Sequence, residues 1–183
     1  DESIDVLIDA THPFAKTISN HATIAARDLG CPHLILRRPN WVMPKIAQII
    51  NFSQMTEVAN CSAIQGKRVF LSSGTQGLQS LAKLKNVWFL VRLITKPDEF
   101  LPLAHHKVII DSPPFVEEQE LALLEEHKID LMVSKHSGGS LPAKITAATK
   151  LKIPIILIHQ PPPPVGRKTK RIEEALAWLK ARL

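Results

Sequence analysis

Three polar turns, each directly after a short apolar stretch, carry the residue types that could bind a ligand or do chemistry. They cover residues 9–15, 72–77 and 135–140. Small residues, hydroxyls and backbone N–H groups at expected helix starts are typical of sites for phosphate or carboxylate groups. His12 and His136 lie in the first and third turns, and a histidine can donate a proton near neutral pH. The turns therefore predict an anion site with candidate proton donors.

Basic side chains near these turns could pair with the negative charges of a ligand. Arg37 and Arg38 follow an apolar stretch, Lys135 opens the third turn, and Lys144 comes about one helical turn after it. Each turn also has a plainer explanation, in which hydroxyls cap a helix and charged side chains face solvent. The residue types alone leave both explanations open.

Several catalytic motifs are missing from the sequence. It has no glycine-rich P-loop, no Gly-x-Gly-x-x-Gly fingerprint and no Gly-x-Ser-x-Gly nucleophile elbow. Tyrosine is absent, which excludes mechanisms that use a tyrosine as an acid. His105 and His106 are adjacent, so on a strand they would point to opposite faces, and we predict no metal site.

The turns must be positioned by strands and helices that alternate along the chain. Short apolar stretches predict strands at residues 4–9, 33–37, 46–52, 68–72, 87–94, 107–111, 129–134 and 155–159. Helical spacing predicts helices at about residues 14–29, 53–60, 76–84, 112–127, 141–151 and 170–182. Thr11 is expected to cap the first helix and Pro13 to lie in its first turn. The positions expected to face the core are Phe14, Ile18, Ala22, Ala25, Ala26 and Leu29 in the first helix, and Ile172, Ala175, Leu176, Leu179 and Leu183 in the last.

Alternation of apolar strands with helices is typical of parallel sheets that are covered by helices on both faces. We therefore expect an α/β fold with two Rossmann-like lobes, at residues 1–95 and 96–183. Pro97 and Pro102 interrupt the pattern between residues 94 and 106, which suggests a hinge there. In such sheets ligands bind at the carboxyl ends of strands, where the three polar turns fall.

Composition limits the class of protein. The 183 residues include 23 Lys and Arg against 17 Asp and Glu, a formal net charge of +6, so the chain should attract anions. No aromatic RNA-binding motif accompanies the basic residues, and we expect no nucleic-acid partner. No apolar run reaches the roughly 18 residues of a membrane span, and the first residues are unlike a signal peptide. Two cysteines without a Cys-x-x-Cys spacing favour free thiols in a reducing compartment, which predicts a cytoplasmic protein.

Five segments of the chain occur in the same order as in a known family. They are residues 9–15 (Asp-Ala-Thr-His-Pro-Phe-Ala), 38–41 (Arg-Pro-Asn-Trp), 71–74 (Leu-Ser-Ser-Gly), 112–115 (Ser-Pro-Pro-Phe) and 135–139 (Lys-His-Ser-Gly-Gly). The chain resembles the precorrin-6A and cobalt-precorrin-6A reductases of corrin-ring biosynthesis over essentially its whole length, and the first segment is the most specific. That family normally begins with a strand and a Gly-Gly-Thr turn, which this chain lacks. The resemblance is therefore to a member whose N-terminal lobe is incomplete.

The resemblance implies hydride transfer from a reduced nicotinamide cofactor, NADPH with NADH as the alternative, to a conjugated tetrapyrrole macrocycle. The expected cofactor-binding residues are Asp9, Ala10, Thr11, His12, Phe14, Ser137, Gly138 and Gly139. The expected substrate-binding residues are Arg38, Trp41, Ser72, Ser73, Gly74, Lys135 and Lys144. His12 and His136 are the candidate catalytic proton donors, and the sequence does not choose between them. The alternative is a non-catalytic α/β module that binds an anionic metabolite.

Overall fold

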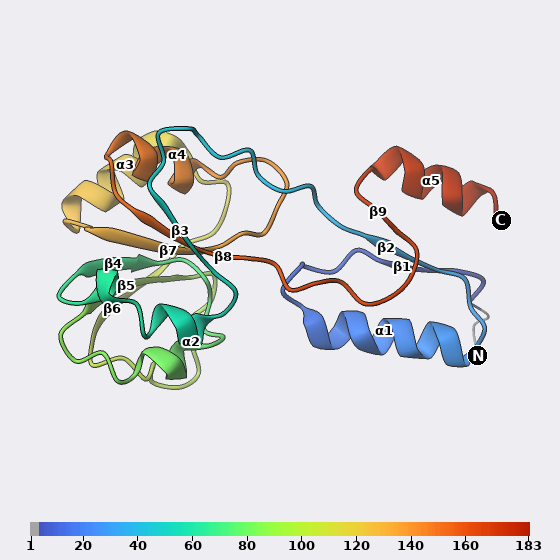
Figure 1. Ribbon diagram of the computed structural model, residues 1–183, viewed down its shortest axis with the longest axis horizontal. Helices are drawn as coiled ribbons and strands as arrows, with labels where there is room; N and C mark the ends of the chain where they lie inside the picture. Colours follow the sequence, from blue (N-terminus) through green and yellow to red (C-terminus); the bar gives the residue numbers. More distant parts are fainter. Residues whose placement is uncertain (1–3) are drawn as a thin grey trace. The chain divides into compact units, whose positions relative to one another are not determined.

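A computed structural model describes residues 4–183 of the chain, which divide into two compact units (Figure 1). Unit 1 contains the described residues up to Trp41, residues 137–139 and residues 160–183. Unit 2 contains residues 42–136 and 140–159. The chain therefore passes from one unit to the other four times.

This division corrects the domain boundary expected near residue 95. Strands β5 (Trp88–Leu93) and β6 (His105–Ile110) lie on either side of that boundary and pair in parallel, from Trp88 opposite His105 to Leu93 opposite Ile110. The proline-containing segment between them is a loop that links neighbouring strands of one sheet, and not a hinge between lobes. The expected boundary also places residues 160–183 in the second lobe, whereas in the structure they belong to unit 1.

Unit 1 contains a parallel sheet whose described strands follow the order β1 (Leu7–Asp9), β2 (His33–Leu36) and β9 (Lys168–Thr169). Figure 1 shows helices α1 (Lys16–Asp28) and α5 (Ile172–Lys180) on opposite sides of this sheet. Leu34, Ala175 and Trp178 form a buried cluster between β2 and α5. The sheet is parallel as the alternation of strands and helices predicts.

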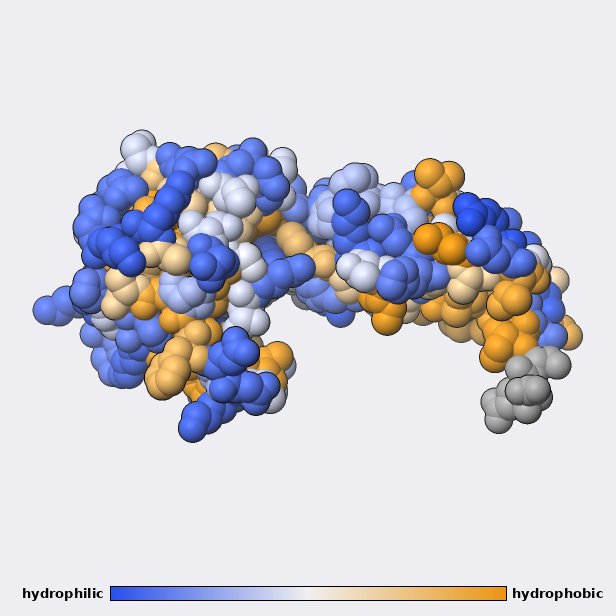
Figure 2. Space-filling view, turned by 90° about the horizontal axis from the view of Figure 1, so that it is seen from below, coloured by the Kyte–Doolittle hydropathy of each residue, from blue (hydrophilic) through white to orange (hydrophobic). Residues whose placement is uncertain are grey.

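The helix faces of unit 1 agree with the expectation at Ala26 and Ala175 and differ from it at several larger apolar residues. In α1 the buried residues are Ser19 and Ala26, whereas Ile18 is exposed and Leu29, just after the helix, is 83 % exposed. In α5 the buried residues are Ala175 and Trp178, while Ile172, Leu176 and Leu183 are exposed. Figure 2 shows hydrophobic surface on this part of the molecule. Both helices therefore carry apolar side chains that the described strands of this sheet leave uncovered.

Unit 2 contains a six-stranded parallel sheet, counted over the described residues, in the order β3-β8-β7-β4-β5-β6. The remaining strands are β3 (Ile49–Phe52), β4 (Arg68–Leu71), β7 (Leu131–Lys135) and β8 (Ile155–Ile158). The central strands are buried on both faces, which explains why their sequences are continuous apolar runs rather than alternating ones.

Helices cover both sides of this sheet. Figure 1 shows α3 (Glu117–Glu126) and α4 (Ala143–Lys150) on one side and α2 (Met55–Val58) on the other. The segment expected to be a helix up to residue 84 forms only the short 3₁₀ turn Leu78–Leu81, and a second such turn covers Ser62–Ile64. Within residues 4–183, no helix is both long and apolar enough to span a lipid bilayer.

Candidate functional site

The site in unit 2 lies where the strand order reverses direction. From the central strand β4 the chain continues to β5 and β6 on one side, and then returns to β7 on the other side of β4. In open parallel sheets, ligands bind at the carboxyl ends of the two strands that flank such a reversal. Ser72 follows β4, and its N–H donates to the carbonyl oxygen of Val133 in β7 at 3.2 Å. The second polar turn therefore occupies the position that the fold favours for a ligand.

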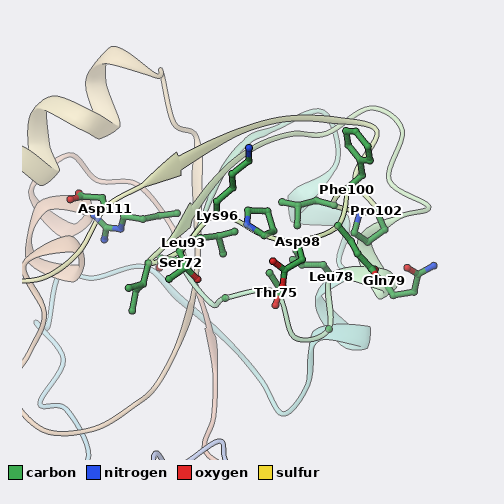
Figure 3. A pocket seen from close by; sticks show the side chains of 18 of the residues that line it. Ser72, Thr75, Leu78, Gln79, Leu93, Lys96, Asp98, Phe100, Pro102 and Asp111 are labelled. Carbon is green, nitrogen blue, oxygen red and sulfur yellow. The ribbon is translucent and has the colours of Figure 1, made fainter.

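A pocket of about 800 Å³ opens beside these strand ends. Figure 3 shows Ser72 and Leu93 near strand ends, and Asp98, Phe100 and Pro102 on the loop that follows β5. The charged side chains that line the pocket are Arg92, Lys96, Lys144, Asp98, Glu99 and Asp111. The pocket thus combines three cations with three carboxylates, next to apolar groups such as Phe100 and Phe115.

Lys144 is the most perturbed side chain in this pocket. It lies in the first turn of α4, and its Nζ donates a hydrogen bond to Ser72 Oγ at 2.9 Å. Burial, together with the charge of the nearby Arg92, lowers the pKa of its ammonium from 10.5 to about 8, and Glu120 partly opposes both effects. At pH 7 Lys144 therefore carries a proton that it can release far more readily than an ordinary lysine.

A buried ion pair lies next to Lys144. Arg92 in β5 and Glu120 in α3 approach to 2.6 Å between Nη1 and Oε1, and their side chains are 6 % and 1 % exposed. The Arg92 guanidinium also lies 3.9 Å from the ring centre of Phe115 and 4.9 Å from that of Phe70. Together with Lys144 these groups carry a net charge of +1 at neutral pH, in a place with little water.

The other residues of the second turn, and Lys135 of the third, also belong to unit 2. Gly74 has a φ of +75°, and a Cβ there would meet no atom within 4 Å, so its backbone faces open space. Ser73 is buried, with no hydrogen-bond partner for its hydroxyl within the described part of the chain. Lys135 Nζ donates to Gln76 Oε1 at 3.1 Å, and burial lowers the pKa of Lys135. Ser72, Gly74 and Lys144 line the pocket, whereas Lys135 does not.

His136 follows β7 and is only 5 % exposed. Its ring stacks on that of His159 with the ring centres 5.8 Å apart, and His159 Nε2 lies 2.8 Å from Asn51 Oδ1. Burial lowers the pKa of His136, a backbone hydrogen bond partly opposes this effect, and the charge of His159 makes a smaller contribution that lowers it again. His136 is therefore mainly neutral at pH 7.

In unit 1, the first polar turn is organised by Asp9 at the end of β1. The N–H and the hydroxyl of Thr11 donate to Asp9 Oδ1 at 3.0 and 2.7 Å. Burial raises the pKa of the Asp9 carboxyl, but hydrogen bonds with Thr11 and Ser19 and the charge of Arg37 outweigh this and leave it below its usual value. Asp9 Oδ2 is buried and has no hydrogen-bond partner among residues 4–183.

The expected helix cap at Thr11 is wrong. Helix α1 begins at Lys16 after Ala15, with no side-chain cap, and the Thr11 hydroxyl lies between Asp9 and Ser19 instead. Pro13 precedes the helix rather than lying in its first turn. His12 is exposed, and its ring lies 5.9 Å from that of Phe14.

The glycines of the third turn, Gly138 and Gly139, pack against the backbone that follows β2. Gly138 has a φ of +72°, and a Cβ there would lie 2.7 Å from the carbonyl oxygen of Pro39. The N–H of Gly139 donates to that same oxygen at 2.8 Å. Gly138 is thus required for close backbone packing, and the N–H of Gly139 already has a partner within unit 1.

Gly138→Ala is expected to destabilise the protein by about 2–4 kcal/mol, since it adds a backbone clash to the strain of a positive φ. Gly30→Ala is the matched control, because Gly30 has a φ of +65° and its Cβ would meet nothing within 4 Å. Urea unfolding of both variants separates the two contributions. An equal loss of stability in the two variants would show that the contact with Pro39 has no cost.

Two further substrate candidates also lie in unit 1. Arg38 is exposed, and its side chain lies against Gly138 and Gly139. Trp41 is 5 % exposed and counts among the buried core residues. The contacts of these residues with a ligand stay predictions.

The sequence did not predict the ion pair of Arg92 and Glu120, nor that the loop after β5 lines the pocket. Arg92 was the available signal, because it interrupts the otherwise apolar strand Trp88–Leu93. A charge inside a buried strand requires a buried partner. Within the part of the chain that the structure describes, no three His, Cys, Asp or Glu side chains gather as metal ligands.

The two parallel sheets, with polar turns at the carboxyl ends of their strands, define a Rossmann-like α/β protein. The precorrin-6x reductase CbiJ/CobK family matches residues 1–180 of the chain. The chain belongs to this family, in agreement with the resemblance of its turns.

Individual relatives agree with the assignment. The precorrin-6A reductase of Mycobacterium tuberculosis is 40 % identical over 182 residues, which cover 98 % of this chain and 73 % of the relative. The precorrin-6A reductase of Rhodococcus erythropolis is 38 % identical over 178 residues, which cover 96 % and 71 %. The solved structure of CobK precorrin-6A reductase superposes with a TM-score of 0.91 at 29 % identity, over 98 % of this chain and 74 % of that one.

Proposed function

We propose that this protein reduces a corrin-ring precursor of the precorrin-6A type, by hydride transfer from NADPH, in cobalamin biosynthesis. The observation that carries the proposal is Lys144. Its ammonium has a pKa of about 8, is bonded to Ser72, and lines a pocket of about 800 Å³ at the reversal of the strand order. Membership of the precorrin-6x reductase family supports the class of substrate.

We expect the first polar turn, in unit 1, to hold the nicotinamide cofactor. Asp9 Oδ2 is a buried acceptor with no partner in residues 4–183, and such an atom can accept a hydrogen bond from a ribose hydroxyl. Thr11 and Phe14 follow Asp9 in the same turn and belong to the same expected cofactor-binding set. Gly139 can contribute less than its sequence suggests, because its N–H already donates to Pro39. When bound, the reduced nicotinamide supplies the hydride.

The reduction needs a proton as well as a hydride. One carbon of a conjugated double bond gains the hydride, the partner atom gains a proton, and together they add two electrons and two hydrogens to the ring. The Lys144 ammonium gives up that proton through a breaking N–H bond and is left as a neutral amine, which solvent then protonates again. Proton delivery by a positioned side chain contributes about 10²–10⁴-fold to a rate.

Lys144 fits this role better than either candidate histidine. His136 is buried and mainly neutral at pH 7, so its ring nitrogens are weak acids. His12 is exposed on unit 1 and does not belong to the pocket that Lys144 lines. Lys144 is protonated at pH 7 and its pKa is close to the working pH, which is the condition for an efficient acid.

Purified protein mixed with precorrin-6A and NADPH is expected to oxidise NADPH only when the macrocycle is present. Stopped-flow absorbance follows the loss of reduced nicotinamide and the change in the macrocycle spectrum together, and NADH replaces NADPH in a parallel experiment. Binding of the macrocycle without any oxidation of NADPH would contradict the proposal. That result would support the non-catalytic binding module instead.

A further inference from the structure

We propose that unit 1 contains a separate oxyanion site, centred on Arg37, that binds a carboxylate or phosphate group. Arg37 directly follows β2 and lines a pocket of about 580 Å³. The pocket lies within unit 1 and shares no lining residue with the pocket around Lys144. The proposal does not depend on the proposed function.

Arg37 is a buried cation whose hydrogen-bonding groups are not used. It is 7 % exposed, and its Nε and Nη1 have no hydrogen-bond partner among the described residues. Its backbone N–H donates to the carbonyl oxygen of Thr169 at 2.9 Å. Two buried guanidinium nitrogens without hydrogen bonds cost free energy, and a ligand oxyanion in the adjoining pocket would relieve that cost.

A second unused donor lies in the same pocket. Gln160 Nε2 is buried and has no hydrogen-bond partner in the described chain. Gln160 also lies beside Gly138, where a Cβ would come within 2.9 Å of this nitrogen. Two unpaired donors from distant parts of the sequence thus line one pocket, which is the arrangement expected for a site that accepts an oxygen ligand.

The charge of the pocket is strongly positive. Its cationic lining residues are Arg37, Arg38, Lys168, Lys170 and Arg171, and Glu174 is the acidic one. Glu174 is already engaged, because it accepts a hydrogen bond from Thr169 and lies 3.8 Å from Arg171. Asp9 is the carboxylate whose charge acts on Arg37, but no hydrogen bond joins the two.

The ligand chemistry follows from these groups. An arginine fork matches a carboxylate or a phosphate, whose two oxygens can accept parallel hydrogen bonds. Pro161, Pro162 and Pro163 form the apolar side of the pocket, so the anion would be carried by a larger organic molecule. Two sources share this chemistry, namely a carboxylate side chain of the macrocycle and a phosphate of the nucleotide.

The site can be tested with small anions alone. Inorganic phosphate and citrate are titrated into the full chain at constant ionic strength, with chloride as the reference, and the thermal unfolding midpoint is followed. The wild type is expected to gain stability from phosphate or citrate beyond the effect of chloride. Arg37→Gln should raise the apparent Kd at least tenfold, and the exposed Arg38→Gln at least threefold.

Arg27→Gln is the matched control, because Arg27 is an exposed arginine of unit 1 that does not line the pocket. It should change the apparent Kd by less than twofold. The proposal is overturned if phosphate and citrate act no differently from chloride on the wild type. It is also overturned if Arg38→Gln and Arg27→Gln have the same effect, a comparison that holds even when Arg37→Gln fails to fold.

Two further titrations distinguish the sources of the anion. If the site binds the 2′-phosphate of the nucleotide, Arg38→Gln weakens the binding of NADPH but not of NADH, and if it binds the pyrophosphate, Arg38→Gln weakens the binding of both. If it binds a macrocycle carboxylate, Arg38→Gln weakens the binding of precorrin-6A and leaves both nucleotides unchanged. Inorganic phosphate could stabilise the protein while Arg38→Gln leaves the binding of NADPH, NADH and precorrin-6A unchanged. That result would support the oxyanion site and count against the proposed function.

Discussion

Lys144→Met is expected to lower kcat for macrocycle reduction by about 10²–10⁴-fold, because it removes the proposed proton donor and keeps a side chain of similar length. In the wild type, kcat should be flat below pH 8 and fall about tenfold per pH unit above it, as Lys144 loses its proton. The remaining activity of Lys144→Met should not show this decline. Stopped-flow rates between pH 6 and 10 measure both effects.

The same substitution should make the protein more stable at neutral pH. In the folded state Lys144 has a pKa of about 8, against 10.5 in the unfolded chain, so folding is penalised wherever the lysine must be charged. The penalty is complete below pH 8 and disappears as the pH rises towards 10.5. Lys144→Met should therefore gain up to about 3 kcal/mol at pH 7 and nothing at pH 10.5.

Lys150→Met is the matched control for Lys144→Met. Lys150 lies on the same helix, fully exposed, and pairs with Glu117. Its loss should leave kcat and its pH dependence unchanged. If Lys144→Met keeps a wild-type kcat, or if it keeps the decline above pH 8, another group donates the proton.

Glu120→Gln is expected to cost about 3–5 kcal/mol of unfolding free energy, because it leaves the buried Arg92 without a counter-charge. Glu118→Gln makes the same chemical change on an exposed position of the same helix and should cost less than about 0.5 kcal/mol. Urea unfolding measures both. The double variant Arg92→Met with Glu120→Leu should recover much of the loss, since no unpaired charge remains.

Glu120→Gln should also act on the proposed proton donor. Glu120 raises the pKa of Lys144, so its neutralisation should move the decline of kcat from about pH 8 to lower pH. The pH dependence of kcat shows this shift when kcat is calculated per folded molecule. If both Glu120→Gln and Glu118→Gln leave stability unchanged, the ion pair does not hold α3 against β5.

The sequence predicted the strands of unit 2 well, because those strands are buried on both faces. Residues 68–72 and 155–159 were expected as strands and are observed as β4 and β8 within one residue at each end. The polar turn after β4 was expected to carry ligand-binding residues, and it does line the pocket at Ser72 and Gly74. Local hydrophobicity was sufficient here, because strands that are buried on both faces are mostly continuous apolar runs.

Local sequence could not predict the long-range pairings. Strand β3, early in the chain, pairs with β8, while the two residues of β9 complete the sheet of β1 and β2. Lys168 and Thr169 carry no hydrophobic pattern, so nothing in their own sequence indicates a strand. The helix faces were predicted only in part, at Ala26 and Ala175, for a related reason: which side of α5 is buried depends on β2, more than a hundred residues earlier.

The exchange of segments between the two units has a consequence for biosynthesis. A nascent chain leaves the ribosome from its amino end, so β1, α1 and β2 emerge long before residues 160–183. Until those last residues are released, Leu34 has neither Trp178 nor Ala175 to cover it, and one edge of β2 is unpaired. Unit 1 can therefore be completed only after most of unit 2 has been translated, and until then the edge of β2 that pairs with β9 is open to pairing with other chains.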